Sequence, residues 1–104
     1  MPNESRILGF SNAEAIDALT EFCAATKREL PKGGIKKLVF SEKAEVQASA
    51  EFDAGAPPIR FYENEVAAAL IMLCHKRGIP VARRAVKSLQ IAQESIELHL
   101  STRS

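Results

Sequence analysis

The spacing of apolar residues in the first third of the chain predicts an α-helix. From Ile16 onward these residues recur mostly at intervals of three and four, so they line one face of a helix. Ser11 and Glu14 precede this stripe in a capping-box pattern, in which each side chain can bond the other residue's free backbone N–H. We therefore predict a helix that begins near Asn12 and is stopped by the proline and glycines of residues 31–34.

A strict alternation of apolar and polar residues follows over residues 44–52. This alternation is typical of an antiparallel strand with one buried and one solvent-facing side. Residues 35–41 supply the preceding strand, across a tight turn near residues 42–43. Because the apolar side of the second strand is mostly alanine, we expect a helix to pack closely across Ala48 and Ala50.

A second helix is predicted from about Tyr62 or Glu63 to Arg77, after a loop and a brief strand at residues 59–61. Gly78 follows the last turn and should end the helix. Apolar residues surround this helix for two turns, so more than one of its faces should be covered. The helix either forms the centre of the core or offers its spare face to a second copy of the chain.

The last part of the chain alternates again, from Leu89 to Leu100. Two strands with a turn near residues 93–94 explain this pattern. One bent strand is the alternative, because no glycine supports a two-residue hairpin turn. Residues 81–88 fit either a loop or a short helix.

Together these elements predict an α+β fold, in which an antiparallel sheet of three to five strands carries two helices packed on one face. The predicted order is α-β-β-(β)-α-β-(β). Residues 1–104 form a single small domain, with residues 1–10 and 101–104 expected to fray. No internal repeat and no motif of a known family is evident.

The composition is that of an ordinary globular protein, with 46% hydrophobic and 26% charged residues. A net charge of +1 gives no general case for nucleic-acid binding. The longest apolar run has nine residues, well below the ~20 that span a bilayer, and no secretory signal is visible. Cys23 and Cys74 lie among apolar residues and should be buried, reduced thiols. We expect a cytoplasmic protein without a membrane partner.

Positive charge gathers where the second predicted helix ends. The stretch from Val66 to Gln93 has no acidic residue, and its strong cations fall between residues 76 and 87. Such a segment could hold a phosphate or the backbone of a nucleic acid, although no aromatic residue accompanies it for base stacking. A second basic group surrounds residues 33–34 and would contribute if the two loops meet in space. The candidate anion-binding residues are Lys76, Arg77, Arg83, Arg84, Lys87, Lys32, Lys36 and Lys37.

Other chemistry finds little support. Both cysteines fall in mid-helix or later, where no helix N-terminus lowers a thiol pKa. His99 and Glu97 share one side of a strand but lack further ligands nearby, so no metal site, cofactor or catalytic residue is predicted. We expect a small non-enzymatic binding or interaction module, self-associating through the second helix or a free sheet edge. Nucleic-acid or phosphate-ligand binding through residues 76–87 is the alternative, and a small enzyme is a weaker one.

Overall fold

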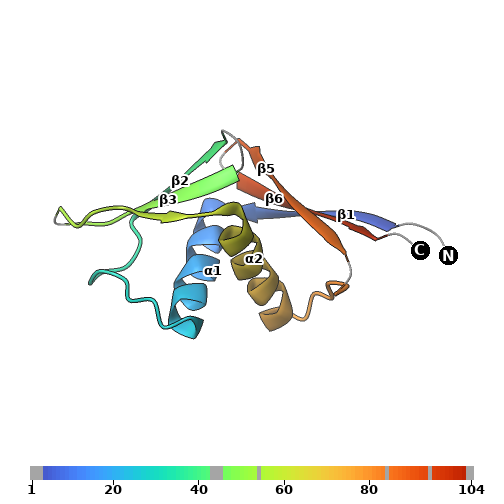
Figure 1. Cartoon of the computed structure of the whole chain (residues 1–104), viewed down its shortest axis with the longest axis horizontal. Coiled ribbons are helices and arrows are strands. Elements are labelled where there is room, and N and C mark those ends of the chain that lie inside the picture. The colour runs from blue at the N-terminus through green and yellow to red at the C-terminus, as the bar shows by residue number, and fades with distance from the viewer. Residues whose placement is uncertain (1–3, 43–45, 54, 84, 94, 103–104) are drawn as a thin grey trace.

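Two small β-sheets lie over a pair of helices in the computed structural model, which describes residues 4–42, 46–53, 55–83, 85–93 and 95–102. Antiparallel strands form one sheet in the order β1-β6-β5 and the other in the order β2-β3-β4. In Figure 1 both helices lie below the strands. The elements are β1 (Glu4–Ser11), α1 (Asn12–Ala25), β2 (Lys37–Glu42), β3 (Val46–Glu51), β4 (Ile59–Phe61), α2 (Glu63–Lys76), β5 (Val86–Ala92) and β6 (Ser95–Thr102).

The predicted α+β class with antiparallel strands is confirmed. The strands divide into two sheets of three, however, instead of joining in one sheet. The sheets approach each other where β5 lies near β2 and β3, at the top of Figure 1. Alternation within a strand reports which of its sides is buried, but it does not report which strand lies beside it. The division into two sheets was therefore not visible in the pattern.

Strand β1 is the largest departure from the prediction. Its partner is β6, in a register that runs from Glu4 opposite Thr102 to Ser11 opposite Ser95. The expected fraying is thus wrong for residues 4–10 and 101–102, while residues 1–3 and 103–104 lie outside the described part. An exposed Ile7 beside the half-buried Leu8 obscures the alternation that would have marked this strand.

Helix α1 ends several residues earlier than predicted. The backbone N–H of Arg28 donates to the carbonyl of Cys23 (2.8 Å) and that of Lys27 to the carbonyl of Ala24 (3.3 Å), which is the hydrogen-bond pattern of a Schellman motif. Lys27 takes the left-handed conformation that this motif requires, with φ of 58°. Glycine is the usual residue at this position. The prediction therefore placed the helix end near the glycines at residues 33–34 and not at Lys27.

The second half of the chain follows the prediction closely. Helix α2 spans Glu63–Lys76, and Gly78 closes it with φ of 73°. The brief strand at residues 59–61 is present, and the C-terminal segment is a pair of strands instead of one bent strand. The described residues between 81 and 85 form a loop, and β5 starts at Val86. The predicted turns near residues 42–43 and 93–94 lie partly outside the described residues.

The core lies between the sheets and the helices. Helix α2 packs against β3, whose Ala48 and Ala50 are fully buried, as the alanine-rich face predicted. Small side chains at these positions allow the close approach. The largest fully buried side chains are Phe61, Leu19, Leu70, Ile96, Leu98, Val66, Cys23 and Cys74.

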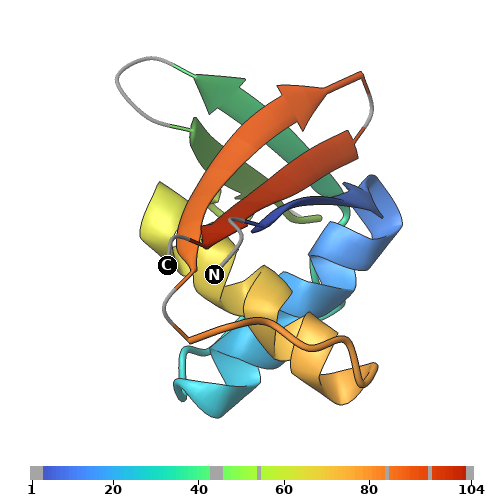
Figure 2. The same ribbon diagram turned by 90° about the vertical axis from the view of Figure 1, so that its right-hand side faces the viewer.

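The element order contains a repeat that was not evident in the sequence. The unit β1-α1-β2-β3 is followed by β4-α2-β5-β6, and each unit's first strand pairs with the other unit's last strand. The two helices cross in Figure 2 as equivalent elements. Seven identical residue pairs stand 51 positions apart in the two units: Phe10 and Phe61, Glu14 and Glu65, Ala18 and Ala69, Leu19 and Leu70, Cys23 and Cys74, Lys36 and Lys87, and Leu38 and Leu89.

Backbone geometry repeats at the same spacing. Helix α2 closes with a bond from the Ile79 N–H to the Cys74 carbonyl (2.8 Å), which matches the bond from Arg28 to Cys23. Leu38 of β2 and Leu89 of β5 are also equivalent, and both are buried. The fold is therefore pseudo-twofold, and any feature found in only one half stands out against its counterpart.

Candidate functional site

Two of the predicted anion-binding cations are engaged by carboxylates. Lys76 pairs with Glu21 and Arg77 with Glu14, so both side chains tie the end of α2 to α1. The Arg77 guanidinium, together with the Ser11 backbone N–H, lowers the pKa of the Glu14 carboxyl below its usual 4.5. These two cations therefore bridge the helices, and each has a carboxylate beside it.

The two basic loops do not meet. Residues 26–36 lie to the left of the helix pair in Figure 1 and residues 77–83 to its right. They are pseudo-twofold counterparts: Lys32 corresponds to Arg83 and Lys36 to Lys87. On the first side, Lys36 lies 3.7 Å from the carboxylate of Asp53. Lys37 stands opposite Glu51 in the sheet register. Arg84 lies outside the described residues.

The second side holds a groove between α2 and the edge strand β5. Two adjoining hollows of about 430 and 260 Å³ share the side chains of Ile71 and Lys87. We call their union the α2–β5 groove. Its lining residues are Glu63, Asn64, Ala67, Ala68, Ile71 and His75 of α2, Val81, Ala82 and Arg83 of the following loop, and Lys87, Ser88 and Leu89 of β5.

The two ends of the α2–β5 groove differ in chemistry. Ala67, Ala68 and Ile71 give the middle of the larger hollow an apolar helix side, while Glu63 and Asn64 make its far end polar. His75, Arg83 and Lys87 line the smaller hollow, and no carboxylate is among the described residues that line it. We call this part the cationic end. Lys87 reaches it with its ammonium bonded to the carbonyl of Ala85 (2.9 Å).

The corresponding place between α1 and β2 is built differently. There the amide of Asn12 donates to the Leu38 carbonyl of β2 (3.4 Å), which bridges the helix to the strand. Ile16 and Asp17 stand where α2 has Ala67 and Ala68, so a larger aliphatic group and a charge replace the two alanines. The pair of small side chains is thus particular to the second half.

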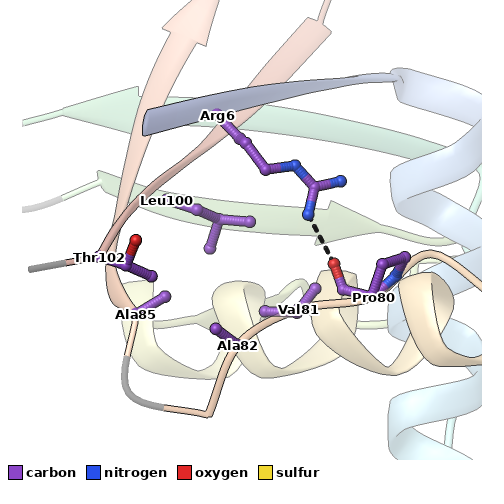
Figure 3. Close-up of a pocket in the computed structure, with 7 residues that line it drawn as sticks. All are labelled: Arg6, Pro80, Val81, Ala82, Ala85, Leu100 and Thr102. Carbon is purple, nitrogen blue, oxygen red and sulfur yellow. Dashed lines mark hydrogen bonds between the residues drawn. The ribbon is translucent and has the colours of Figure 1, made fainter. Parts of the chain in front are cut away.

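A third hollow, of about 310 Å³, lies between the loop residues 80–82 and the strands β1 and β6 (Figure 3). Val81, Ala82 and Leu100 give it an apolar wall. Arg6 lies along its rim in Figure 3, where the guanidinium donates to the Pro80 carbonyl (2.7 Å). That bond fastens the loop to β1, so Arg6 helps to hold the loop that also forms one side of the α2–β5 groove.

Neither cysteine is an activated nucleophile. Cys23 and Cys74 are buried, as predicted, and unpaired, and burial raises the pKa of both thiols. Three or more potential metal ligands do not gather anywhere in the described ranges. His99 and Glu97 do share a strand side, with 3.1 Å between Nε2 and Oε1. Neither of the two described helices has the length and apolar character needed to cross a bilayer.

Sequence reasoning found Arg83 and Lys87 but missed most of the groove. The sequence pattern assigned no role to His75, and it placed Ala67 and Ala68 only within the apolar part of the second helix. One pattern in the sequence does indicate the groove. The second helix is apolar on all sides for two turns and carries a run of small residues, so an apolar strip is expected to stay at the surface. Comparison with protein-family models, curated proteins and solved structures finds no match.

Proposed function

We propose that the protein is a small non-enzymatic interaction module that binds a segment of polypeptide in the α2–β5 groove. The observation that carries this proposal is the junction of an apolar helix face with the exposed first half of an edge strand. Apolar surface supplies affinity, and the unpaired backbone of an edge strand supplies directional hydrogen bonds. Both are needed to hold a peptide segment in one orientation.

The bound segment belongs either to a second copy of the chain or to a different protein. We expect the protein to act in the cytoplasm, where the buried thiols of Cys23 and Cys74 stay reduced. Burial of the partner against Ala67, Ala68 and Ile71 would account for the apolar character of α2 beyond the needs of the core.

Sedimentation velocity over a micromolar concentration range, combined with selection of short random peptides displayed on phage, tests the proposal. The variant Ala68→Trp fills the groove, and Asp17→Trp places the same side chain at the equivalent position of α1. We expect either a concentration-dependent dimer or enriched peptides, lost in Ala68→Trp and kept in Asp17→Trp. A strict monomer that enriches no peptide overturns the proposal, as does binding that survives Ala68→Trp in a folded variant.

Phosphate-ligand or nucleic-acid binding is the second candidate, favoured by the two strong cations, Arg83 and Lys87, at the cationic end. It is the weaker one, because Lys76 and Arg77 already pair with carboxylates and the basic loops lie on opposite sides. Fluorescence anisotropy with mixed-sequence RNA and DNA at low salt is the test. Binding that weakens with salt and with Arg83→Glu would support this candidate. Absence of binding to both probes would exclude its general form.

A further inference from the structure

We propose that the occupant of the α2–β5 groove is an extended, acidic segment of a different protein, which adds a strand to the free edge of β5. This inference rests on the proposed function and specifies its partner. Three features of the described residues lead to it: the open edge of β5, the small side chains of α2, and the charges at the two ends of the groove.

The edge of β5 supports an extended occupant. β5 is the outer strand of the order β1-β6-β5, so one side of its backbone has no partner strand in the described sheet. Residues 86–88 are exposed, and the strand side of the groove begins among them. An extended segment laid along an edge strand satisfies such unpaired N–H and C=O groups in both chains.

The small side chains of α2 support an occupant that is a strand. Helix α2 borders β5 on its free side with Ala67 and Ala68, where the equivalent place beside β2 has Ile16 and Asp17. Two alanines leave room for a second backbone between helix and sheet. Alternate side chains of an added strand would then point onto Ile71 and the alanines, and the others toward solvent.

Charge selects the composition of the occupant. The cationic end places His75, Arg83 and Lys87 around one hollow with no carboxylate among its lining residues. Glu63 lies in the other hollow, near the start of α2. A segment whose acidic residues lie at the cationic end, with none beside Glu63, complements these charges. The reversed orientation would place its carboxylates beside that of Glu63.

The same charges argue against a second copy as the occupant. β5 reads Val-Lys-Ser-Leu-Gln-Ile-Ala and contains no acidic residue. If the β5 strands of two copies paired edge to edge, neither would supply the carboxylates that the cationic end of the other lacks. A different protein with an acidic strand-forming segment is therefore the better match.

The composition of selected peptides provides the first test, using random peptides displayed on phage and the full chain. We expect enriched peptides with alternating apolar and polar positions and an excess of Asp and Glu. Lys87→Glu and Arg83→Glu, made separately, should each lower the affinity for the enriched peptides by about tenfold. The loss should be greatest at low salt, where charges are least screened. Lys36→Glu, which reverses the equivalent lysine of the first half, should change affinity less than about twofold.

Hydrogen exchange of the full chain with one enriched peptide provides the second test. Strand addition should slow exchange of alternate backbone amides within residues 86–89 and of the peptide itself. A peptide that binds as a helix would leave these amides unchanged and would overturn the inference.

Failure of this inference can be told apart from failure of the proposed function. If no peptide is enriched and the chain stays monomeric, the interaction module itself is wrong. If peptides bind in the groove but are basic or uncharged, or ignore both charge reversals, the module stands and the acidic strand is wrong. A dimer that Ala68→Trp abolishes would identify a second copy as the occupant and would also overturn the inference.

Discussion

Glu14 connects the start of one helix to the end of the other. Its carboxylate accepts the Ser11 backbone N–H (2.9 Å) and pairs with Arg77. Glu65 repeats this arrangement in α2, where it accepts the Tyr62 N–H (3.0 Å) and pairs with Arg28 (3.2 Å). Each helix therefore presents a glutamate that caps its own first turn and bonds a cation from the end of the other helix.

The Glu14 arrangement makes stability depend on pH. The lowered pKa of Glu14 means that its contribution is fully present above the unfolded value of 4.5 and is lost as pH falls through the folded value. Glu14→Gln should lower the free energy of unfolding by about 0.5–1 kcal/mol at neutral pH, because the pair is partly exposed. Urea unfolding at neutral pH and well below 4.5 should show the difference shrinking in acid. If the difference in free energy of unfolding between Glu14→Gln and the unchanged chain stays constant with pH, the prediction is wrong. Asp17→Asn, on the exposed face of the same helix, serves as the control.

The buried thiols give a second prediction for single residues. Burial raises the pKa of both Cys23 and Cys74, so little thiolate exists at mildly alkaline pH and little of it is accessible. We expect both cysteines to react with a thiol reagent only in denaturant, at least about a hundredfold faster than in the native protein. Mass spectrometry of labelled peptides measures each site. Rapid labelling of either residue in the folded protein would show that its helix opens readily.

Single residues also show the limit of sequence reasoning. Lys76 and Arg77 were candidate ligand-binding cations, yet the structure pairs them with Glu21 and Glu14, more than 50 positions away. No local pattern reveals such a pairing, because it depends on how the two helices cross. Lys87 and Arg83 do lie together in the groove, since the loop and strand that carry them are close in sequence.

At the scale of elements, helix ends were predicted well only where the usual residue marks them. Gly78 identified the end of α2, whereas Lys27 performs the same role in α1 without being a glycine. The strands were found where alternation was clean, as in β3 and β6. β1 was missed, and an exposed isoleucine interrupts its pattern. What decides such positions is contact with a distant element, which the local sequence does not contain.

The equivalent helix ends allow a matched pair of substitutions. Lys27→Gly should raise the free energy of unfolding by about 0.5 kcal/mol, because relief of the left-handed strain exceeds the added freedom of the unfolded chain. Gly78→Ala should lower it by about 1 kcal/mol for the converse reason. A Cβ at Gly78 meets nothing within 4 Å, so only backbone strain enters. Thermal unfolding followed by circular dichroism measures both, and equal signs for the two variants would contradict the motif.

At the scale of the whole molecule, the amino-acid sequence alone did not reveal the repeat of the two β-α-β-β units. Seven identities at a spacing of 51 are few, and most of the loop and strand positions between them differ. The repeat becomes evident once strand pairing is known, because each unit completes its sheet with the first strand of the other. The α2–β5 groove was hidden for the same reason: its two sides come from one helix and one strand whose spatial relation only the fold defines.

The repeat predicts that the chain can be permuted. Thr102 stands opposite Glu4 in the register, so the end of β6 can be joined to the start of β1 as β3 is joined to β4. A permutant opened between Gly55 and Ala56, with the old ends linked by a short glycine extension, should fold to the same structure and lose at most about 2 kcal/mol of stability. Circular dichroism and urea unfolding measure this. A chain opened inside α2, between Ala69 and Leu70, should fail to fold, and an equally stable product there would contradict the prediction.

The pairing of β1 with β6 has a mechanical consequence. Since the bonds of an antiparallel ladder run across the strands, a force applied between Glu4 and Thr102 acts on one end of the ladder and loads its bonds one after another. Tension along the polypeptide would therefore peel β1 away at low force, in the manner of unzipping, before either helix extends. Of the β1 side chains that pack on the core, Leu8 would be uncovered before Phe10, and their apolar surfaces would then be open to a neighbouring protein.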